Sequence, residues 1–560
     1  MKNIHFHFII FFTATIISCT QKIEQDNYTG FDFQPNILWI TCEDMSPRLG
    51  CYNDPLARTP TIDKLARDGI RYTNAYSISG VCAPSRSALI TGMYPTTIGS
   101  MHMRTMTRTS AIDQITDPEL LAIPTYEAVP PPEVKCFTEY LRAKGYYCSN
   151  NSKEDYQFKK PITAWDESSR KAHWRNRSPG QPFFSVFNFT VTHESQVWAR
   201  AGDTLITDPD QVEVPPYYPD SPVIRRDMAR HYDNIALMDA QVNDILGQLK
   251  ADGLEDSTII FFFSDHGDGF PRAKRWIYDS GIKVPLIIKY PDRRQASEVN
   301  DELVSFVDFV PTVLSLTGIE IPDYLQGQAF AGSQKSGARD YIYAAKDRMD
   351  PAMDNQRAVR DKRYKYIRNY MPDRPYVQFL PYRDQMALMQ ELFRYEKEGK
   401  LDKTQALWFQ KTKPLEELYD TWEDPHEVNN LASDPRFHDI LEPLRTAHLK
   451  WKEETQDWGL IPETELIREL WPPDGIQPET REPDIILENL EDPDKLKVII
   501  SCNTEGASIG YMLNDTGMWL LYSHPLEVPG DTKISVQAIR IGYKPSQVVT
   551  RELLTSINML

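Results

Sequence analysis

Short apolar runs alternate with amphipathic stretches along the first half of the chain. Each apolar run has the length of a buried strand, and apolar positions between the runs recur at helical spacing. The longest amphipathic stretch spans about 224–250 and is followed by Gly253. Continuous apolar strands that alternate with helices predict an α/β fold whose central, mostly parallel sheet is sandwiched by helices. The predicted strands are residues 36–41, 183–189, 258–263 and 285–290.

Two shorter helices are predicted from the same pattern. For the first, over residues 60–67, Thr59 is suited to cap the helix, Pro60 to occupy its first turn and Gly69 to end it. The second is expected around residues 134–145, where apolar side chains again recur at helical spacing.

The composition changes in the second half of the chain. Residues 346–470 are expected to form a smaller α+β subdomain, because Tyr, Arg, Asp and Pro become frequent there. After the Pro-rich stretch 471–483, strand-type runs separated by Gly, Asn and Pro predict a terminal β-sandwich over 480–560. Residues 33–345, which precede the α+β subdomain and the β-sandwich, are expected to form the catalytic domain. The strand-type runs of the sandwich are 497–501, 518–522 and 532–541.

The N-terminus is typical of a secreted protein. In residues 1–18, Lys2 precedes an apolar stretch of only ~10 residues, which is too short to span a bilayer. The stretch ends in Ile16-Ile17-Ser18-Cys19, which resembles a bacterial lipoprotein box with cleavage before Cys19 and acylation of its thiol. An ordinary signal peptide with an incidental cysteine is the alternative. We expect residues 19–32 to be a tether that anchors the protein outside the cytoplasm, in the periplasm or at the outer membrane.

Charge and cysteine content narrow the range of functions. The 560 residues include 62 Lys and Arg against 80 Asp and Glu, a net charge of −18, which disfavours binding to nucleic acid or to an anionic lipid surface. Seven cysteines are few for a chain of this length, and an odd number cannot all be paired, so the protein is not a disulfide scaffold. A local basic pocket remains compatible with this composition.

Metal-capable side chains follow two of the predicted strands. Glu43 and Asp44 come after the first apolar strand, and Asp265 and His266 come after the third. Ligands of parallel sheets bind at the carboxyl ends of the strands, so these side chains are a candidate metal site. Loop carboxylates are also common at strand exits, so ordinary loop residues are the alternative.

Cys82 stands just before a predicted helix, with Pro84 in its first turn. Free backbone amides at a helix start favour an anionic group there. A thiolate nucleophile and a buried structural cysteine are both compatible with this position. The local sequence favours a third interpretation, because Cys82-Ala-Pro-Ser-Arg86 resembles the signature of the sulfatases, in which this cysteine is converted after translation to formylglycine (3-oxoalanine).

The resemblance is to the type I, formylglycine-dependent sulfatases of the alkaline phosphatase superfamily, and it extends from Phe33 to about Ala432. It implies the alkaline-phosphatase-like fold of that family and the hydrolysis of sulfate esters. The branch that this chain resembles most contains heparan N-sulfatases and bacterial sulfatases of algal polysaccharides. The matching segments occur in the family's order and are 36–44, 59–69, 82–92, 264–267 and 417–432.

The resemblance also implies the chemistry and its cofactor. Hydrated formylglycine is a geminal diol: one hydroxyl attacks sulfur and expels the sugar hydroxyl, and the other then eliminates sulfate and restores the aldehyde. The implied cofactor is Ca²⁺, ligated by Glu43, Asp44, Asp265, His266 and the group derived from Cys82. Glu43 departs from the family's usual Asp, and a nitrogen ligand such as His266 is unusual for Ca²⁺.

Further side chains match the family's catalytic positions. Arg86, one helical turn after the cysteine, is expected to hold the diol, and Lys274 to bind sulfate and assist the leaving group. Lys153 occurs at the family's spacing, although Asp155 stands where a histidine is usual. His193 resembles the family's general acid. Taken singly, each of these would be an ordinary solvated surface residue.

The resemblance predicts a lipoprotein that hydrolyses sulfate esters on polysaccharide-derived sugars, most closely those of ulvan. Its expected partners are a sulfated oligo- or polysaccharide and the formylglycine-generating or maturase enzyme that modifies Cys82; no nucleic acid is expected. Three alternatives stay open: an N-sulfoglucosamine (heparan) sulfohydrolase, a phosphonate or phosphodiester hydrolase of the same superfamily, and an inactive glycan-binding lipoprotein.

Three smaller predictions complete this picture. Residues 480–560 resemble the β-sandwich appended to some hexosaminidases, which favours a glycan context. His102 is a candidate substrate contact. The remaining cysteines are expected to be core or surface fillers, with a disulfide between two of them left open, and they are Cys42, Cys51, Cys136, Cys148 and Cys502.

Overall fold

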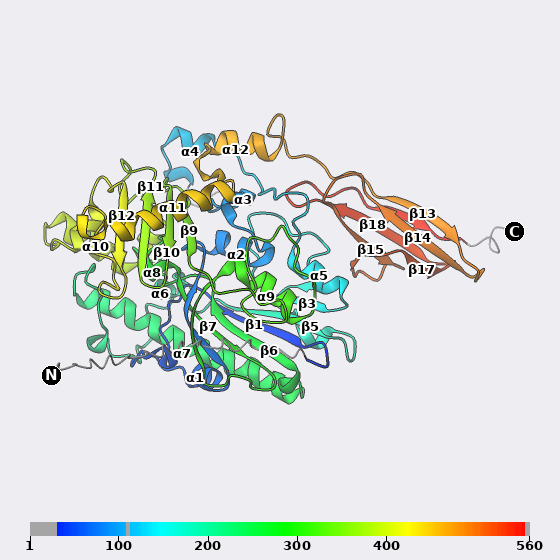
Figure 1. Ribbon diagram of the computed structural model, residues 1–560, viewed down its shortest axis with the longest axis horizontal. Coiled ribbons are helices and arrows are strands. Elements are labelled where there is room, and N and C mark those ends of the chain that lie inside the picture. Colours follow the sequence, from blue (N-terminus) through cyan, green and yellow to red (C-terminus); the bar gives the residue numbers. More distant parts are fainter. Residues whose placement is uncertain (1–30, 108–111, 555–560) are drawn as a thin grey trace, which may run out of the picture.

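An eight-stranded sheet lies at the centre of the computed structural model, which describes residues 31–107 and 112–554 (Figure 1). In the order β4-β3-β5-β1-β6-β7-β2-β8, the central strands β5 (Phe183–Phe189), β1 (Asn36–Cys42) and β6 (Thr258–Ser264) are parallel, as predicted. The fourth predicted strand, β7 (Lys283–Lys289), runs antiparallel to both of its neighbours. The other strands are β2 (Ile70–Tyr76), β3 (Tyr147–Asn151), β4 (Glu167–Ser168) and β8 (Val299–Ser305).

Helices cover both faces of this sheet, which explains why every residue of β1 and β6 is buried. Alternate strand residues point to opposite faces. Leu38 and Phe262 pack with residues of α1 (Pro60–Arg67) and α7 (Pro222–Ala251). Trp39 packs on the other face, with residues of α2, α5 and α9. The bounds of these three helices are Cys82–Thr91, Phe137–Ala143 and Phe309–Leu316.

The start of α1 differs in one detail from the prediction. Thr59 occupies the N-cap position, but its side chain makes no capping hydrogen bond. Its hydroxyl instead donates to Asp63 Oδ1 at 3.1 Å and accepts the backbone N–H of Gly50 at 3.0 Å. The threonine therefore joins the helix to the preceding loop. The remaining α-helices are α3 (Pro95–Ile98), α4 (Pro118–Ala122), α6 (Ser195–Ala199), α8 (Asp279–Ile282), α10 (Ala387–Lys397), α11 (His438–Glu454) and α12 (Glu463–Leu470).

A second, antiparallel sheet of four strands follows, in the order β12-β11-β10-β9. Its first strand, β9 (Ile342–Lys346), pairs with β10 along its whole length and so crosses the expected boundary at residue 345. The backbone N–H of Ala345 donates to Ile78 at 2.9 Å, which fixes this sheet against the segment that precedes Cys82. Its other strands are β10 (Gln356–Arg360), β11 (Tyr364–Asn369) and β12 (Glu416–Asp420).

Two further antiparallel sheets share an apolar core and form a sandwich that projects from the rest of the molecule (Figure 1). The sandwich is fastened to the α/β part through side chains on both sides: Lys135 Nζ donates to Gly506 O at 2.6 Å, and Arg540 donates to Pro130 O at 2.7 Å. One sheet holds β13 (Asp484–Asn489), β14 (Lys495–Ser501) and β17 (Leu526–Pro529). The other holds β16 (Leu520–Leu521), β15 (Ser508–Leu513), β18 (Lys533–Ile539) and β19 (Val549–Glu552).

The structure tests the prediction about disulfides but not the predictions about the N-terminus. The signal sequence, Cys19 and most of the tether lie outside the described residues. No helix within residues 31–107 and 112–554 is long and apolar enough to cross a membrane. All cysteines of the described part are free thiols, so the disulfide left open above does not form there.

Candidate active site

The two predicted pairs of metal-capable residues meet at one edge of the sheet. Strands β1 and β6 end side by side, and the backbone N–H of Asp265 donates to Cys42 O at 3.1 Å. Asp44 has a φ of 53°, a left-handed conformation that is uncommon outside glycine, and its N–H donates to Asp265 Oδ1 at 3.2 Å. Glu43 and His266 are buried beside them. The turn after β1 is thus bent so that carboxylates from two strands face each other.

Cys82 is the first residue of α2, and it points at this group of side chains. Its Sγ lies 3.4 Å from His266 Nε2. The whole helix is buried, including Arg86 one turn further on. Gly80 is required in the approach to the helix, because a Cβ there would come within 2.1 Å of the carbonyl oxygen of Trp276. The chain around Cys82 is therefore held by backbone packing.

The side chains around Cys82 form two overlapping clusters that fit a hard divalent cation. In the first, the ligand atoms of Asp44, Cys82, Asp265 and His266 all lie within 4.8 Å of one another. In the second, the ligand atoms of Asp44 and Cys82 lie equally close to those of Glu43 and His193. Carboxylate oxygens are the ligands that Ca²⁺ prefers, and Glu43 Oε1 is buried without a hydrogen-bond partner. Glu43 groups with His193 and not with Asp265, so Asp44 is the carboxylate that both clusters share.

Cations from three parts of the chain contact these carboxylates. Lys274 Nζ lies 2.6 Å from Asp44 Oδ2, and Lys153 Nζ lies 2.8 Å from Glu43 Oε2. Arg86 Nη2 lies 3.0 Å from Asp265 Oδ2. The three basic residues that the sequence singled out are therefore brought together around Cys82. Arg86 also donates a hydrogen bond from Nη1 to Asn188 Oδ1 at 2.8 Å.

This mutual contact keeps the buried carboxylates ionised. Burial alone would raise the pKa of Asp44, but the charges of Lys274, His193 and His266 together outweigh it and hold that pKa well below its usual range. Burial also opposes ionisation of Asp265, yet His266 and Arg86 lower its pKa to about 2. His266 in turn has its pKa raised to about 10, because the two aspartates outweigh its burial. The carboxylates are thus charged at neutral pH, the state that a metal ion requires.

His193 lies at the mouth of this centre. Its side chain is 19% exposed, and its Nε2 is 3.9 Å from Glu43 Oε2 and 4.0 Å from Asp44 Oδ2. Its Nδ1 is 2.8 Å from Ser195 Oγ. One imidazole nitrogen is therefore held by the protein while the other faces the clusters. Burial, followed by the charge of Lys274, lowers the pKa of His193.

Two charged residues at the centre were not identified from the sequence. Glu194 Oε1 lies 3.1 Å from Lys274 Nζ and 2.7 Å from Arg275 Nη2, and the backbone N–H of Glu194 donates to Asp44 Oδ2 at 2.6 Å. Glu194 thus joins the strand-end turn to the segment that carries the lysine. Burial opposes its charge, but Arg275 and Lys274 lower its pKa to about 2. The available signal was adjacency alone, since Glu194 follows His193 and Arg275 follows Lys274.

His102 lies outside both clusters. Its Nδ1 accepts the backbone N–H of Arg348 at 3.2 Å, and its backbone oxygen accepts a hydrogen bond from Gln157. The ring is buried, with only 5% of the residue exposed. His102 therefore supports a neighbouring loop through Nδ1, while its Nε2 has no hydrogen-bond partner. Its contact with substrate stays a prediction. Asp155, which stands where the family has a histidine, has a left-handed φ of 59°. Burial opposes the charge of Arg86, but Asp265, Glu43, Cys82 and then Asp155 raise the pKa of its guanidinium.

Comparison with known proteins agrees with this arrangement. The family model described as Sulfatase matches residues 35–319, and that described as N-sulphoglucosamine sulphohydrolase, C-terminal, matches residues 269–405. An ulvan-active sulfatase of Formosa agariphila is 44% identical over 92% of this chain and 91% of its own length. The N-sulphoglucosamine sulphohydrolase of Homo sapiens is 26% identical over 78% of this chain and 94% of its own length. A protein solved in complex with its substrate D-glucosamine-2-N,6-O-disulfate has the same fold, with a TM-score of 0.53 and 17% identity over 77% of this chain and 99% of that one.

Proposed function

The chain belongs to the sulfatase family, and we propose that it hydrolyses sulfate esters on sugars of an algal polysaccharide of the ulvan type, with Cys82 as the reacting residue. The observation that carries the proposal is the position of Cys82 at the start of α2, where its sulfur faces His266 amid ionised carboxylates and three cations. The match to the ulvan-active sulfatase over nearly the whole of both chains supports the substrate class.

The residues present divide the work between holding a cation and holding sulfate. Asp44 and Asp265 would bind Ca²⁺, with His266 and Glu43 beside them, and the ion would supply Lewis-acid polarisation of the sulfate. Formylglycine derived from Cys82 would supply a nucleophilic hydroxyl and, in its second hydroxyl, the means of releasing sulfate. The sites of both groups fit this chain because the carboxylates are ionised and Cys82 is adjacent to them.

The cations of the site act on the substrate itself. A sulfate ester carries its negative charge on oxygens around sulfur, and Lys153, Lys274 and Arg86 place positive charge close to Cys82. Asp265 orients Arg86, and Glu194 orients Lys274. His193, held through Nδ1 by Ser195, is placed to donate a proton from Nε2 to the leaving sugar oxygen.

The setting of the reaction is part of the same proposal. The proposed partner in maturation is an enzyme that generates formylglycine at Cys82, since the genetic code supplies only the thiol. Residues 1–18 would direct export, and Cys19 would carry acyl chains such as palmitate that anchor the protein at a bacterial membrane outside the cytoplasm. A surface or periplasmic position suits a protein that meets polysaccharide fragments.

The test is sulfate release from defined substrates by protein co-produced with a formylglycine-generating enzyme. We expect release from sulfated ulvan oligosaccharides, weaker release from N-sulfoglucosamine and little hydrolysis of an aryl phosphate diester. Preference for N-sulfoglucosamine would replace the O-sulfate assignment, and preference for the phosphate diester would replace the sulfatase assignment. A protein that binds the oligosaccharides but releases no sulfate after verified modification of Cys82 would contradict catalysis.

A further inference from the structure

Two aromatic side chains border the catalytic centre on the side of His193. The ring of Tyr382 lies 6.3 Å, between centroids, from the imidazole of His193 and 5.4 Å from the indole of Trp198. Trp198 belongs to α6, the helix that begins two residues after His193, whereas Tyr382 lies in the segment between β11 and α10. One ring from the α+β subdomain therefore contacts both the proposed general acid and the helix that follows it.

The segment that carries Tyr382 is fixed beside the centre by polar contacts. Arg383 donates to Asp384 Oδ1 at 2.6 and 2.9 Å and to the backbone oxygen of Gln378 at 2.9 Å. Burial lowers the pKa of this guanidinium, the charge of Asp384 raises it, and the charge of Arg275 lowers it again. The backbone next to Tyr382 is thus held close to the charged residues of the centre.

Apolar packing also connects this segment with α6. Val197 belongs to the buried core cluster that contains Tyr376 and Met386, and Trp198 packs against the same cluster. Tyr376 and Met386 flank Tyr382 along the chain. The two aromatic side chains therefore rest on one core, and the surface that they form is present before any ligand binds.

Both side chains keep part of their surface and their polar atoms for a ligand. Tyr382 and Trp198 are half-buried, and their rings meet at 76°, so the edge of one faces the plane of the other. Within residues 31–107 and 112–554, neither the Tyr382 hydroxyl nor the Trp198 N–H has a hydrogen-bond partner. The pair therefore offers an apolar ring surface together with two groups that can form hydrogen bonds.

The position of this surface relates it to the leaving group of the reaction. Ser195 Oγ lies 2.8 Å from His193 Nδ1, and His193 Nε2 faces the carboxylates beside Cys82. A proton donor lies about 3 Å from the oxygen that it protonates. The sugar bonded to that oxygen would then lie next to the imidazole, with which Tyr382 is in ring contact.

The chemistry of the surface suits a sugar ring better than a second anion. Arg383 pairs with Asp384 at 2.6 Å, and its side chain is only 7% exposed. Arg200, just beyond α6, pairs with Asp203 at 2.9 Å. Neither arginine leaves its charge uncompensated. A sugar ring instead packs its C–H groups against aromatic rings and offers hydroxyls to a phenol and an indole N–H.

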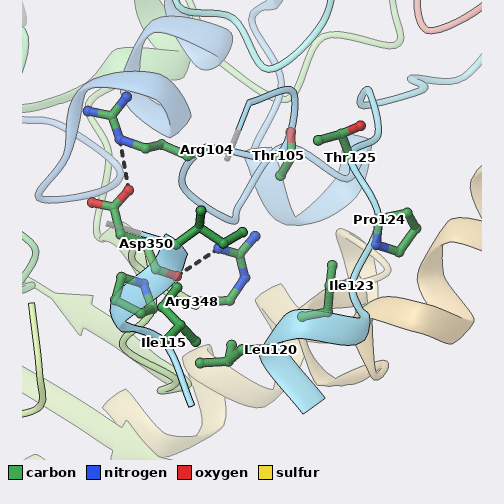
Figure 2. Close-up of a pocket in the computed structure, with 11 residues that line it drawn as sticks. Arg104, Thr105, Ile115, Leu120, Ile123, Pro124, Thr125, Arg348 and Asp350 are labelled. Atoms are coloured by element: carbon green, nitrogen blue, oxygen red, sulfur yellow. Dashed lines mark hydrogen bonds and ion pairs between the residues drawn. The ribbon is translucent and has the colours of Figure 1, made fainter. Parts of the chain in front are cut away.

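The cavity shown in Figure 2 is a separate feature. Arg104 pairs with Asp350 on one side of it, and Ile123 lies on the opposite side. Between the loops of this cavity and the start of α2 is a layer of buried side chains, which are Val81, Ala83, Met103 and Met349. This layer separates the cavity from Cys82, so the cavity is not part of the surface beside His193.

We propose that Tyr382 and Trp198 bind the sugar ring that carries the sulfate, through stacking on its C–H groups and hydrogen bonds to its hydroxyls, and thereby select the sugar. This inference rests on the proposed function, because the sugar is the leaving group that His193 protonates. The cations around Cys82 recognise the sulfate group whatever it is attached to, whereas the aromatic pair recognises its carrier.

The first test compares variants that differ in the aromatic ring alone. Tyr382→Leu, which keeps an apolar side chain, should lower kcat/KM for a sulfated ulvan oligosaccharide by about 10-fold, mainly through KM, and Trp198→Leu should act in the same way. Tyr382→Phe, which keeps the ring, should stay within about threefold. The matched control is Tyr364→Leu, because Tyr364 is a half-buried tyrosine that packs with the cluster around α11, and it should change neither constant.

Product inhibition separates contact with the sugar from support of the centre. The desulfated oligosaccharide should inhibit Tyr382→Leu about 10-fold less strongly than the parent, whereas inorganic sulfate should inhibit both equally. Equal weakening of the two inhibitors would make Tyr382 a support of the catalytic centre and overturn the inference, as would unchanged inhibition by the desulfated oligosaccharide. A parent enzyme that releases no sulfate from the oligosaccharide would count against the proposed function, and calorimetric binding of the desulfated product would still test Tyr382.

Discussion

Two buried groups of charged residues in this protein contain the same types of side chain but affect the pKa of their aspartates in opposite directions. Around Cys82, cations match or exceed the carboxylates, and Asp265 has its pKa lowered to about 2. Beneath the second sheet, Arg357 is fully buried between Asp347 and Asp457, at 3.0 and 2.6 Å. There two carboxylates share one cation, and burial, only partly offset by Arg357, raises the pKa of Asp347 to about 7.

The ratio of cations to carboxylates therefore distinguishes a buried group that can bind ligands from one that stabilises the fold. At Cys82 the carboxylates stay ionised and Glu43 keeps an oxygen without a partner, so the centre can accept a metal ion and an anion. The guanidinium nitrogens of Arg357 donate to carboxylate oxygens of Asp347 and Asp457, and these ion pairs hold the loop at Gly459 against the sheet. A Cβ at Gly459 would come within 1.9 Å of Arg357, which shows how tightly that loop is seated.

The strongest test of the comparison removes the reacting atom. Cys82→Ala should abolish sulfate release, by roughly 10⁴-fold or more, because no other side chain of the site can form a diol. The unfolding midpoint should change by no more than a few degrees. Cys502→Ser, which alters a thiol of the terminal sandwich, is the control and should keep full activity. Release of sulfate by the alanine variant near the unmutated rate would remove Cys82 from the mechanism.

Loss of the buried cation Arg357 should lower the stability of the fold. Arg357→Met leaves two buried carboxylates without their cation, and we expect a loss of about 3–5 kcal/mol in the free energy of unfolding. Denaturant titration of variant and parent measures it. Arg445→Met removes an ion pair to Glu416 whose arginine side chain is 32% exposed, and it should cost only about 0–1 kcal/mol. Equal effects of the two substitutions would contradict a special role for the Arg357 group.

The catalytic centre should respond to loss of a carboxylate in activity and metal dependence. Asp265→Asn should lower kcat/KM by roughly 10²- to 10³-fold, because the site loses a ligand charge and the partner of Arg86. The parent enzyme should lose activity in chelator and regain it with Ca²⁺, and the variant should need more Ca²⁺. Asp256→Asn, an exposed carboxylate just before the opposite end of β6, is the control. Activity of the parent unaffected by exhaustive chelation would contradict a metal at this site.

The smallest expected effect is a pH dependence of stability near Arg357. Burial, and then the charge of Arg357, lowers the pKa of His448 from 6.5 to about 4. A depressed histidine pKa adds stability that is present above pH 6.5 and is lost as the pH falls towards 4, here by up to about 3 kcal/mol. His448→Gln should flatten this part of the profile measured by thermal unfolding, and His438→Gln, an exposed histidine, should leave it unchanged. A slope that survives in His448→Gln would assign it to other groups.

Sequence reasoning succeeded where a local pattern carries the physics. The strands 36–41 and 258–263 were placed within one residue of β1 and β6, because a strand covered on both faces is apolar throughout. Strands β2 and β8 were missed, since IRYTNAY and VNDELVS mix polar and apolar residues at the partly exposed edge of the sheet. The antiparallel direction of β7 has no signature in its own composition.

The candidate site divides in the same way. Cys82, Asp44 and Asp265 could be identified because a motif or a strand exit marks each one. Glu194 and Arg275 could not, because their importance comes from contacts across the fold. The contact of Glu194 with Arg275 joins positions 81 residues apart, and Arg275 has a left-handed backbone, with a φ of 73°, that no local pattern of the sequence records.

The most direct test of the account is the mass of the peptide that contains Cys82, from protein made in the presence of a formylglycine-generating enzyme. The account predicts an aldehyde, which differs from cysteine by the loss of one sulfur and two hydrogens and the gain of one oxygen, with sulfate release rising in proportion to the modified fraction. An unmodified thiol in protein that is fully active on sulfated oligosaccharide would contradict it.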